Sequence, residues 1–407
     1  MRTVFLYSWL LLYSLISFGK TVDSTEIKKA ELIINEAKKK YAPDRRSEYF
    51  VAKFDTSGSL NITVESTSQS AFEAIKTELN HQNIKATLNF EILPSKHLKD
   101  KIYGLANLSV CNNRFAADHT SEMATQVLLG NPVKLLKKEN GYYLIRTPDN
   151  YISWTDDIGI TALDSNQMNN WKLQKRIIYS APYGQSYQEA SKKSAPVSDL
   201  VAGNIFVLIA KEKQFYKVFY PDGRLAYIPL KEATDYSGWA SQANPKASQI
   251  VKTAKSMIGI PYLWGGTSSK GLDCSGFTKT CYFLNGIILQ RDASQQALYG
   301  ESINILEKDT VSIAKCLQNL KPGDLLFFAS AKNKRKDARI THTAIYLENG
   351  EFIQAAGLVK INSLISSAAN YDKYQTSTLV SARRIISSIN APGITRVDQH
   401  PYYVLNR

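Results

Sequence analysis

The chain has 407 residues, long for one domain, so about two to four domains are expected. Its apolar content of 44% and charged content of 21% are ordinary for a soluble globular protein. The formal net charge of +14 indicates either a solvated basic surface or attraction to an anionic partner. No basic and aromatic motif of a nucleic-acid-binding fold accompanies this charge, which argues against nucleic acid as the partner.

The first residues have the pattern of an export signal. Arg2 precedes an apolar run from Val4 to Phe18, and Ser17-Phe18-Gly19 fits a small-x-small cleavage site, so residues 1–19 are predicted to be a signal peptide. The run is short for a spanning helix, and no cysteine lies near the cleavage site. We therefore expect an exported protein, periplasmic or extracellular, with no integral membrane anchor.

Residues 20–100 predict a small α+β domain. The expected elements are, in order, a helix over 24–41, strands near 49–54 and 60–64, a helix around 72–79 and a strand over 88–92. No catalytic constellation accompanies this αββαβ pattern, so packing or partner binding is its expected role.

An internal repeat follows between residues 104 and 235. Gly130-Asn131 aligns with Gly203-Asn204 at an offset of 203 − 130 = 73 residues, and Tyr143 aligns with Tyr216 at the same offset. Short strands rich in β-branched and aromatic residues, joined by Pro-Asp turns, predict small β-barrels. The predicted barrels, which resemble bacterial SH3-like modules, span 101–165 and 166–235.

Four segments are predicted to lack regular structure. They are a polar insertion in the second barrel over 184–194, a linker over 234–245, a solvated hairpin loop over 332–339 and a loosely packed tail beyond the last strand at 379–386.

Cys274 is the candidate nucleophile. It follows Asp273, a favourable N-cap, and precedes Phe277 and Cys281 at helical spacing. A thiol in the first turn of a helix is exposed to the helix dipole and to unpaired N–H groups, both of which favour the thiolate. Such a thiolate needs a histidine with which to exchange protons.

Histidine is scarce, with five in the chain. Only His342 follows Cys274 within a strongly patterned segment, the predicted strand 340–347. Asn349-Gly350 then signals a hairpin, and a second strand covers 352–355. His342 is therefore the candidate general base.

Residues 250–386 resemble the NlpC-type, papain-like cell-wall cysteine peptidases. The matching motifs are Pro261–Gly266, Asp273–Phe277, Arg291-Asp292, Pro322–Phe328 and His342–Gln354. The resemblance implies a papain-like α+β catalytic domain over 246–390, with no metal or cofactor. It also implies that Cys274 attacks an amide, that His342 is the base and that Gln354 orients His342. The third position is more often histidine in the family, but a glutamine oxygen can also accept from an imidazole N–H.

The hairpin offers a geometric test of the Gln354 assignment. A two-residue loop at Asn349-Gly350 places Gln354 opposite Ile345, away from the face of His342. A three-residue turn over 348–350, with Gly350 in the left-handed region, places Gln354 opposite Ala344 and on the face of His342. The triad therefore predicts the three-residue turn.

Two SH3-like modules before an NlpC-type domain are similar to the γ-D-glutamyl-L-diamino-acid endopeptidases. That similarity implies a murein stem peptide with a free N-terminal L-Ala as substrate. It also implies substrate-binding roles for Glu122, Tyr151, Trp264, Ser275 and Asp292. A buried carboxylate at Asp292 needs a cation, which is either the ligand ammonium or a neighbouring basic residue such as Arg291. The alternatives are an amidase or acyltransferase, and a wall-binding protein without activity.

Four cysteines are present, and none has the C-x-x-C spacing of a zinc site. Cys281 is interpreted as a core residue of the Cys274 helix. Cys111 and Cys316 can form a disulfide if the fold brings them close together.

Overall fold

The computed structural model describes residues 23–241, 245–330 and 338–405, which form two compact units, Met1–Leu93 and Pro94–Arg407. The predicted signal peptide and most of the predicted loop 332–339 lie outside the described residues. Within the described ranges, no helix is both long and apolar enough to cross a bilayer.

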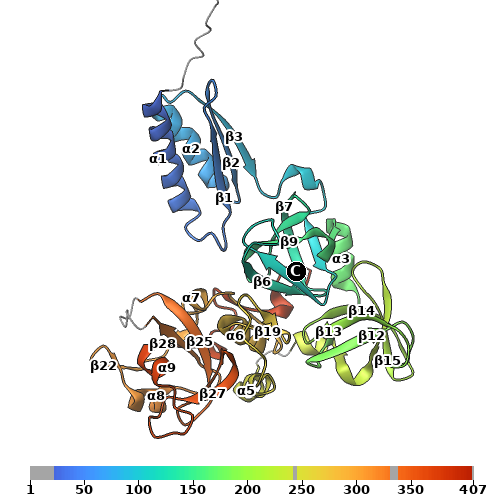
Figure 1. Cartoon of the computed structure of the whole chain (residues 1–407). Helices are drawn as coiled ribbons and strands as arrows, with labels where there is room; N and C mark the ends of the chain where they lie inside the picture. Colours follow the sequence, from blue (N-terminus) through green and yellow to red (C-terminus); the bar gives the residue numbers. More distant parts are fainter. Residues whose placement is uncertain (1–22, 242–244, 331–337, 406–407) are drawn as a thin grey trace, which may run out of the picture. The chain divides into compact units, whose positions relative to one another are not determined.

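The first unit has the predicted αββαβ order. Its elements are α1 (Ser24–Tyr41), β1 (Phe50–Asp55), β2 (Leu60–Ser66), α2 (Gln69–His81) and β3 (Ala86–Ile92). Strand β1 pairs antiparallel and β3 pairs parallel with the central β2, and both helices pack against this sheet (Figure 1). Ile34 of α1 and Ile75 of α2 bury their side chains against Ile62 and Val64 of β2, which explains the helical spacing of the apolar residues.

The second unit begins with two seven-stranded antiparallel sheets, which we term the first and second β-domains. The first contains β4 (Tyr103–Ala106), β5 (Val110–Arg114), β6 (Met123–Leu128), β7 (Pro132–Glu139), β8 (Tyr142–Arg146), β9 (Ile152–Asp156) and β10 (Ile160–Leu163). The second contains β11 (Arg176–Tyr179), β12 (Tyr183–Tyr187), β13 (Pro196–Val201), β14 (Ile205–Glu212), β15 (Phe215–Phe219), β16 (Leu225–Pro229) and β17 (Ala233–Asp235). The 3-10 turns η1 (Lys96–Leu98), η2 (Asp157–Gly159) and η3 (Leu230–Glu232) accompany them.

The two β-domains confirm the internal repeat. Their sheets have the same strand order, β10-β4-β7-β8-β9-β5-β6 in the first and β17-β11-β14-β15-β16-β12-β13 in the second. Even the register shift between β7 and β8 at Leu135 recurs between β14 and β15 at Leu208. The predicted insertion over 184–194 is wrong, because residues 188–195 join β12 to β13 just as residues 115–122 join β5 to β6.

Two short helices flank the second β-domain. Helix α3 (Ser165–Leu173) precedes it, and α4 (Tyr236–Ala240) follows it within the segment predicted as a linker. Trp239 of α4 is buried, and its Nε1 donates to the carbonyl of Leu284 at 2.8 Å. The linker prediction is therefore wrong for residues 236–240, which attach the second β-domain to the domain predicted over 246–390, here termed the catalytic domain after that prediction.

The catalytic domain has a six-stranded sheet in the order β21-β28-β24-β25-β26-β27. The strands are β21 (Glu301–Ser302), β24 (Leu325–Ala329), β25 (Ile340–Tyr346), β26 (Glu351–Ala356), β27 (Leu358–Ser363) and β28 (Leu379–Arg384). The helices are α5 (Ala247–Lys255), α6 (Cys274–Phe283), α7 (Ala293–Gln296), α8 (Ile313–Asn319) and α9 (Lys373–Thr378). Short strand pairs complete it: β18 (Thr267–Ser268) with β19 (Gly271–Leu272), and β22 (Leu306–Glu307) with β23 (Thr310–Val311).

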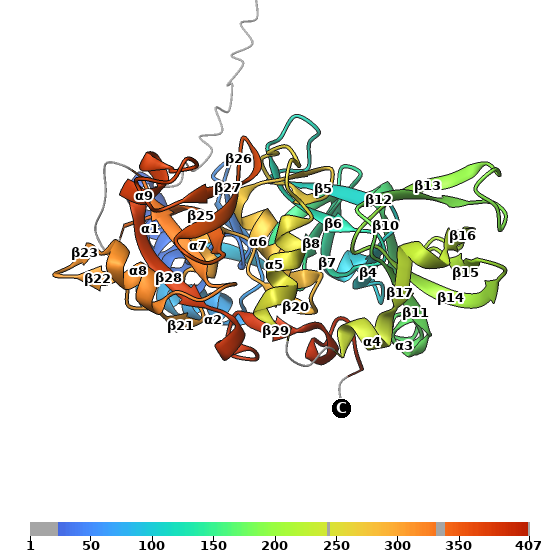
Figure 2. The same ribbon diagram turned by 90° about the horizontal axis from the view of Figure 1, so that it is seen from below.

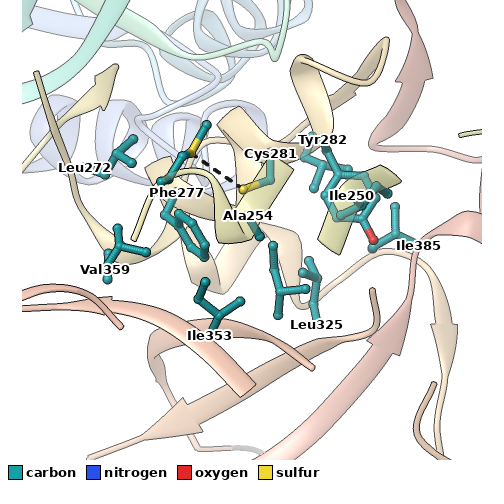
Figure 3. Close-up of a cluster of buried hydrophobic side chains, with 14 of the residues drawn as sticks. Ile250, Ala254, Leu272, Phe277, Cys281, Tyr282, Leu325, Ile353, Val359 and Ile385 are labelled. Atoms are coloured by element: carbon teal, nitrogen blue, oxygen red, sulfur yellow. Dashed lines mark hydrogen bonds between the residues drawn. The ribbon is translucent and has the colours of Figure 1, made fainter. Parts of the chain in front are cut away.

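The core of this domain holds α6 against the sheet. Phe277 and Cys281 of α6 pack in one apolar cluster with Ala254 of α5 and the sheet residues Leu325 and Ile353 (Figure 3). All five are fully buried, so α6 is fixed relative to β24 and β26 of the sheet. The interpretation of Cys281 as a core residue is confirmed.

The C-terminal segment is packed, contrary to the predicted loose tail. Beyond η4 (Ile386–Ser388), β29 (Ile394–Arg396) pairs with β20 (Ile287–Leu289), and η5 (Val397–Gln399) follows. Tyr403 is buried and donates to Asn131 Oδ1 of the first β-domain at 2.7 Å, while its carbonyl accepts from Arg176 of the second. Figure 2 shows this segment running from the catalytic domain toward α3 and α4. Buried apolar contacts and hydrogen bonds across three domains outweigh its polar composition.

All four cysteines are free. Cys111 Sγ lies 3.2 Å from the carbonyl oxygen of Gly159, and Cys316 belongs to a separate apolar cluster in the catalytic domain. The possible disulfide between Cys111 and Cys316 is therefore not formed.

Candidate active site

Cys274 is the first residue of α6, and the loop before it holds that position. Asp273 is the N-cap, as predicted; its Oδ1 accepts from the amide of Gly276 at 2.6 Å and its Oδ2 from the amide of Gly265 at 3.0 Å. A Cβ on Gly276 would lie 2.0 Å from the carbonyl oxygen of Gly266. The glycines of the motif therefore let the preceding loop approach the first helical turn closely.

A buried arginine, Arg291, supports the same loop. Its Nη1 and Nη2 donate to the two carboxylate oxygens of Asp273 at 3.1 and 2.5 Å, and its Nε donates to Thr125 Oγ1 of β6 at 2.8 Å. One guanidinium therefore joins the N-cap of α6 to the first β-domain. Sequence reasoning considered Arg291 only as a neighbour of Asp292, because Asp273 and Thr125 are distant in sequence.

His342 on β25 and Gln354 on β26 meet as the triad predicts. His342 Nε2 lies 2.6 Å from Gln354 Oε1, and Gln354 is fully buried. The predicted register is confirmed, because Ile345 pairs with Ile353 and the next pair along places Gln354 opposite Ala344.

The hairpin turn explains this register. Leu347 N donates to Glu351 O at 2.9 Å, which leaves residues 348–350 as the predicted three-residue turn. Gly350 has φ +82°, as predicted, and Asn349 is also left-handed with φ +51°. Glu351 N donates to Glu348 O, so Leu347 and Glu348 both face Glu351, and this extra residue turns Gln354 to the face of His342.

The electrostatics of Cys274, the candidate nucleophile, disfavour the predicted resting thiolate. Burial, and then the charge of Asp273, raise the pKa of Cys274 to about 12, although the amide of Thr343 and the charge of Arg291 act in the opposite direction. Burial also lowers the pKa of His342 below its usual 6.5. Both directions favour a neutral Cys274 thiol and a neutral His342 imidazole before substrate binds, so the helix terminus alone does not ionise the sulfur.

Two predicted substrate-binding residues meet across a domain boundary. Tyr151, in the turn after β8, places its hydroxyl 3.4 Å from Asp292 Oδ2 at the start of α7. The Asp292 side chain keeps 29% of its surface exposed, and its Oδ1 lies 4.0 Å from Arg291 Nη1. Arg291 makes its shorter contacts to Asp273, while the Asp292 side chain stays partly exposed to solvent.

The other three predicted residues lie at different depths. Trp264 is 61% exposed and Glu122 is exposed at the start of β6. Trp264 and Glu122 each precede a residue of one close backbone contact. A Cβ on Gly265 would lie only 2.7 Å from the carbonyl oxygen of Met123. Ser275 is only 5% exposed, and its Oγ accepts from Arg291 at 3.1 Å. Ser275 therefore belongs to the buried network below the site.

Comparisons with known proteins agree with this arrangement. The family model described as NlpC/P60 family matches residues 259–384, and the one described as bacterial dipeptidyl-peptidase Sh3 domain matches residues 114–157. A γ-D-glutamyl-L-lysine dipeptidyl-peptidase of Bacillus subtilis is 30% identical over 235 residues, 57% of this chain and 71% of the relative. One of the same name from Bacillus cereus is 25% identical over 245 residues, 58% of this chain and 68% of the relative.

A solved structure supports the fold. The crystal structure of an NlpC/P60 family protein from Bacillus cereus superposes with a TM-score of 0.57 at 24% identity, covering 70% of this chain and 99% of that one. At 24% identity, this likeness shows the fold of the chain.

Proposed function

From the premise that the chain belongs to the NlpC/P60 family of cysteine peptidases, we propose that it is an exported endopeptidase acting on murein stem peptides. It hydrolyses the amide between γ-D-glutamate and the L-diamino acid of stem peptides whose N-terminal L-alanine is free. The observation that carries this assignment is the contact between Tyr151 and Asp292, a phenol and a partly exposed carboxylate beside Arg291, whose guanidinium also holds the N-cap of the Cys274 helix.

Cys274 and His342 supply the covalent chemistry. As the sulfur attacks the γ-glutamyl carbonyl carbon, the thiol proton passes to His342 Nδ1, because Nε2 is engaged by Gln354. The tetrahedral oxyanion is stabilised by the amide of Cys274, which lies in the first helical turn, where amides lack an intrahelical partner. The imidazolium then protonates the leaving amine of the diamino acid as the C–N bond breaks.

The resulting thioester is hydrolysed by water, with His342 again accepting a proton. The products are a dipeptide that ends in D-glutamate and a peptide that begins with the diamino acid, and the thiol of Cys274 is restored.

Specificity for a free amino terminus comes from charge. An L-alanyl ammonium placed beside Asp292 forms a charge-assisted hydrogen bond within a partly desolvated site, and Tyr151 can donate to the same carboxylate. Acetylation of that nitrogen removes the charge and leaves Asp292 without its ligand cation. Glu122 adds a second negative group near the rim, and exposed Trp264 offers an aromatic face to the peptide.

The decisive experiment compares two synthetic peptides, L-Ala-γ-D-Glu-L-Lys and its N-acetylated form, with products identified by mass spectrometry. We expect cleavage of the free peptide to exceed that of the acetylated one by about ten- to a hundredfold, since a hydrogen bond to a charged group contributes about 1.5–3 kcal/mol. Asp292→Asn should reduce this ratio, while Asp309→Asn, at an exposed turn, should preserve it. Equal cleavage of both peptides by the wild type would contradict the proposed binding of the free amino terminus by Asp292.

The same assay separates the alternative functions. An amidase or acyltransferase gives different products or joins the acyl group to an added amine, and a wall-binding protein without activity gives no product. Cys274→Ala provides the control, since it should abolish turnover under the peptidase mechanism while leaving binding of the free peptide measurable.

A further inference from the structure

The amide of Gln354 is held from the side opposite His342. Its Nε2 donates to Asp372 Oδ2 at 3.1 Å and to Asn362 Oδ1 at 2.9 Å, while its Oε1 faces His342. Gln354 has no exposed surface, so a reversed amide would find no water to satisfy it. The direction of these bonds therefore decides which end of the amide meets the imidazole.

Both partners on the far side require the NH2 end of Gln354. A carboxylate such as Asp372 only accepts hydrogen bonds. Asn362 presents its oxygen because its Nδ2 donates to the main-chain carbonyl of Asn370 at 3.3 Å, and a carbonyl also only accepts. The amide oxygen of Gln354 is consequently directed to His342.

This orientation determines the tautomer of the base. With an oxygen opposite it, His342 Nε2 carries the ring proton, and Nδ1 of the neutral ring keeps its lone pair for the proton of Cys274. A reversed amide would place an N–H group against Nε2 and shift the ring proton to Nδ1. The base would then face the thiol with its proton already in place.

We propose that Asp372 is a positioning residue for catalysis, which acts through Gln354 to keep His342 Nδ1 free of its proton. This role rests on the proposed peptidase function. It also explains how an amide serves at this position, since the two ends of an amide differ and need a fixed acceptor to tell them apart.

A purely structural role for Asp372 predicts different behaviour. Asp372 is also the N-cap of α9, where its Oδ1 accepts from the amide of Gln375 at 3.0 Å. Two substitutions separate the roles. Asp372→Asn keeps the shape of the side chain. If the oxygen of the new amide still accepts from the amide of Gln375, its NH2 group faces the NH2 group of Gln354, so two donors meet. Asp372→Ser keeps a capping oxygen and introduces no opposing donor.

The order of the two variants is the test. Under the positioning role, Asp372→Asn loses at least about tenfold in kcat/KM, since a base held in the wrong tautomer can lose up to about 10⁴-fold, and Asp372→Ser loses less. A capping role alone gives the reverse order, because the isosteric variant disturbs α9 least.

The tautomer is read independently by NMR of the full chain labelled with ¹⁵N-histidine, with His342 assigned through His342→Gln. We expect the Nε2–H form in the wild type and in Asp372→Ser, and the Nδ1–H form in Asp372→Asn. An unchanged tautomer with unchanged activity in Asp372→Asn overturns the positioning role. A wild type that shows the Nε2–H tautomer but cleaves neither stem peptide overturns the proposed function instead, so the two failures are distinguishable.

Discussion

Lys279 of α6 forms a buried ion pair with Asp149 of the first β-domain. Their side chains are 19% and 1% exposed, and Thr147 Oγ1 donates to the same carboxylate at 2.5 Å. Lys279 lies five residues after Cys274, and Asp149 lies two residues before Tyr151. The pair therefore connects the nucleophile helix to the turn that carries the proposed substrate clamp.

Removal of one partner should destabilise the chain strongly. Lys279→Met leaves a buried carboxylate without its cation, which costs about 3–5 kcal/mol, whereas Asp149→Asn/Lys279→Met removes both charges and should recover most of that loss. Urea unfolding of the full chain measures both. The control is Lys138→Met, which breaks a pair with Asp157 whose lysine is 49% exposed and should cost less than about 1 kcal/mol. Equal losses in the single and double variants would contradict the coupling.

Local pattern predicts the positions of Cys274 and His342, and the family resemblance adds Gln354. Cys274 is marked by a capping aspartate and flanking glycines, and the hairpin at Asn349-Gly350 leaves two registers for Gln354, of which the triad requires the one observed. The repeat offset was equally readable, because each strand of the second β-domain keeps its distance from its counterpart in the first.

The contacts that assemble the domains cannot be predicted from the sequence. Lys279 and Asp149 are 130 residues apart, and a helical lysine normally predicts a solvated surface. Asp372 lies in a polar stretch whose proximity to Gln354 depends on how β27 returns along β26. The burial of the polar C-terminal segment cannot be predicted from its own composition for the same reason, since that burial comes from surfaces of other domains.

The pH dependence of turnover should report His342. A protonated imidazole cannot accept the thiol proton, so kcat/KM should rise with pH through the pKa of His342, which burial lowers below 6.5. The pKa of Cys274 is raised to about 12, so thiol ionisation should contribute no rise between pH 7 and about 9. The profile of the free L-Ala peptide measures this. A rise in kcat/KM near pH 8.5, matched by a rise at the same pH in the rate of Cys274 alkylation by iodoacetamide, would contradict a neutral thiol and imidazole in the resting enzyme.

Gly276 should tolerate no side chain. A Cβ there would lie 2.0 Å from the carbonyl oxygen of Gly266, which is backbone and cannot rotate away. Gly276→Ala should therefore shift the loop before Cys274, lower kcat by at least about tenfold, and destabilise the chain by about 1–3 kcal/mol. Gly58→Ala is the matched control, since a Cβ added at that position would meet no atom within 4 Å, and it should leave turnover unchanged. Comparable losses in both variants would contradict a specific steric role.

His400 should make the fold sensitive to acid. Its Nε2 donates to the carbonyl of Pro148 at 2.9 Å and its Nδ1 accepts from the amide of Tyr402 at 3.2 Å, so both nitrogens of the neutral ring are used. Burial lowers its pKa from 6.5 to about 4. The unfolded chain therefore binds a proton first as the pH falls, and stability present above pH 6.5 is lost progressively toward pH 4.

A shift of this size corresponds to about 3 kcal/mol. His400→Gln keeps a donor and an acceptor but does not titrate, so it should lose about 3 kcal/mol less than the wild type when urea unfolding is compared at pH 7.5 and pH 4. All other titrating groups are common to both chains and cancel in the difference. Parallel losses in the two proteins would mean that the ring is already protonated in the folded state, which is incompatible with Tyr402 donating to Nδ1.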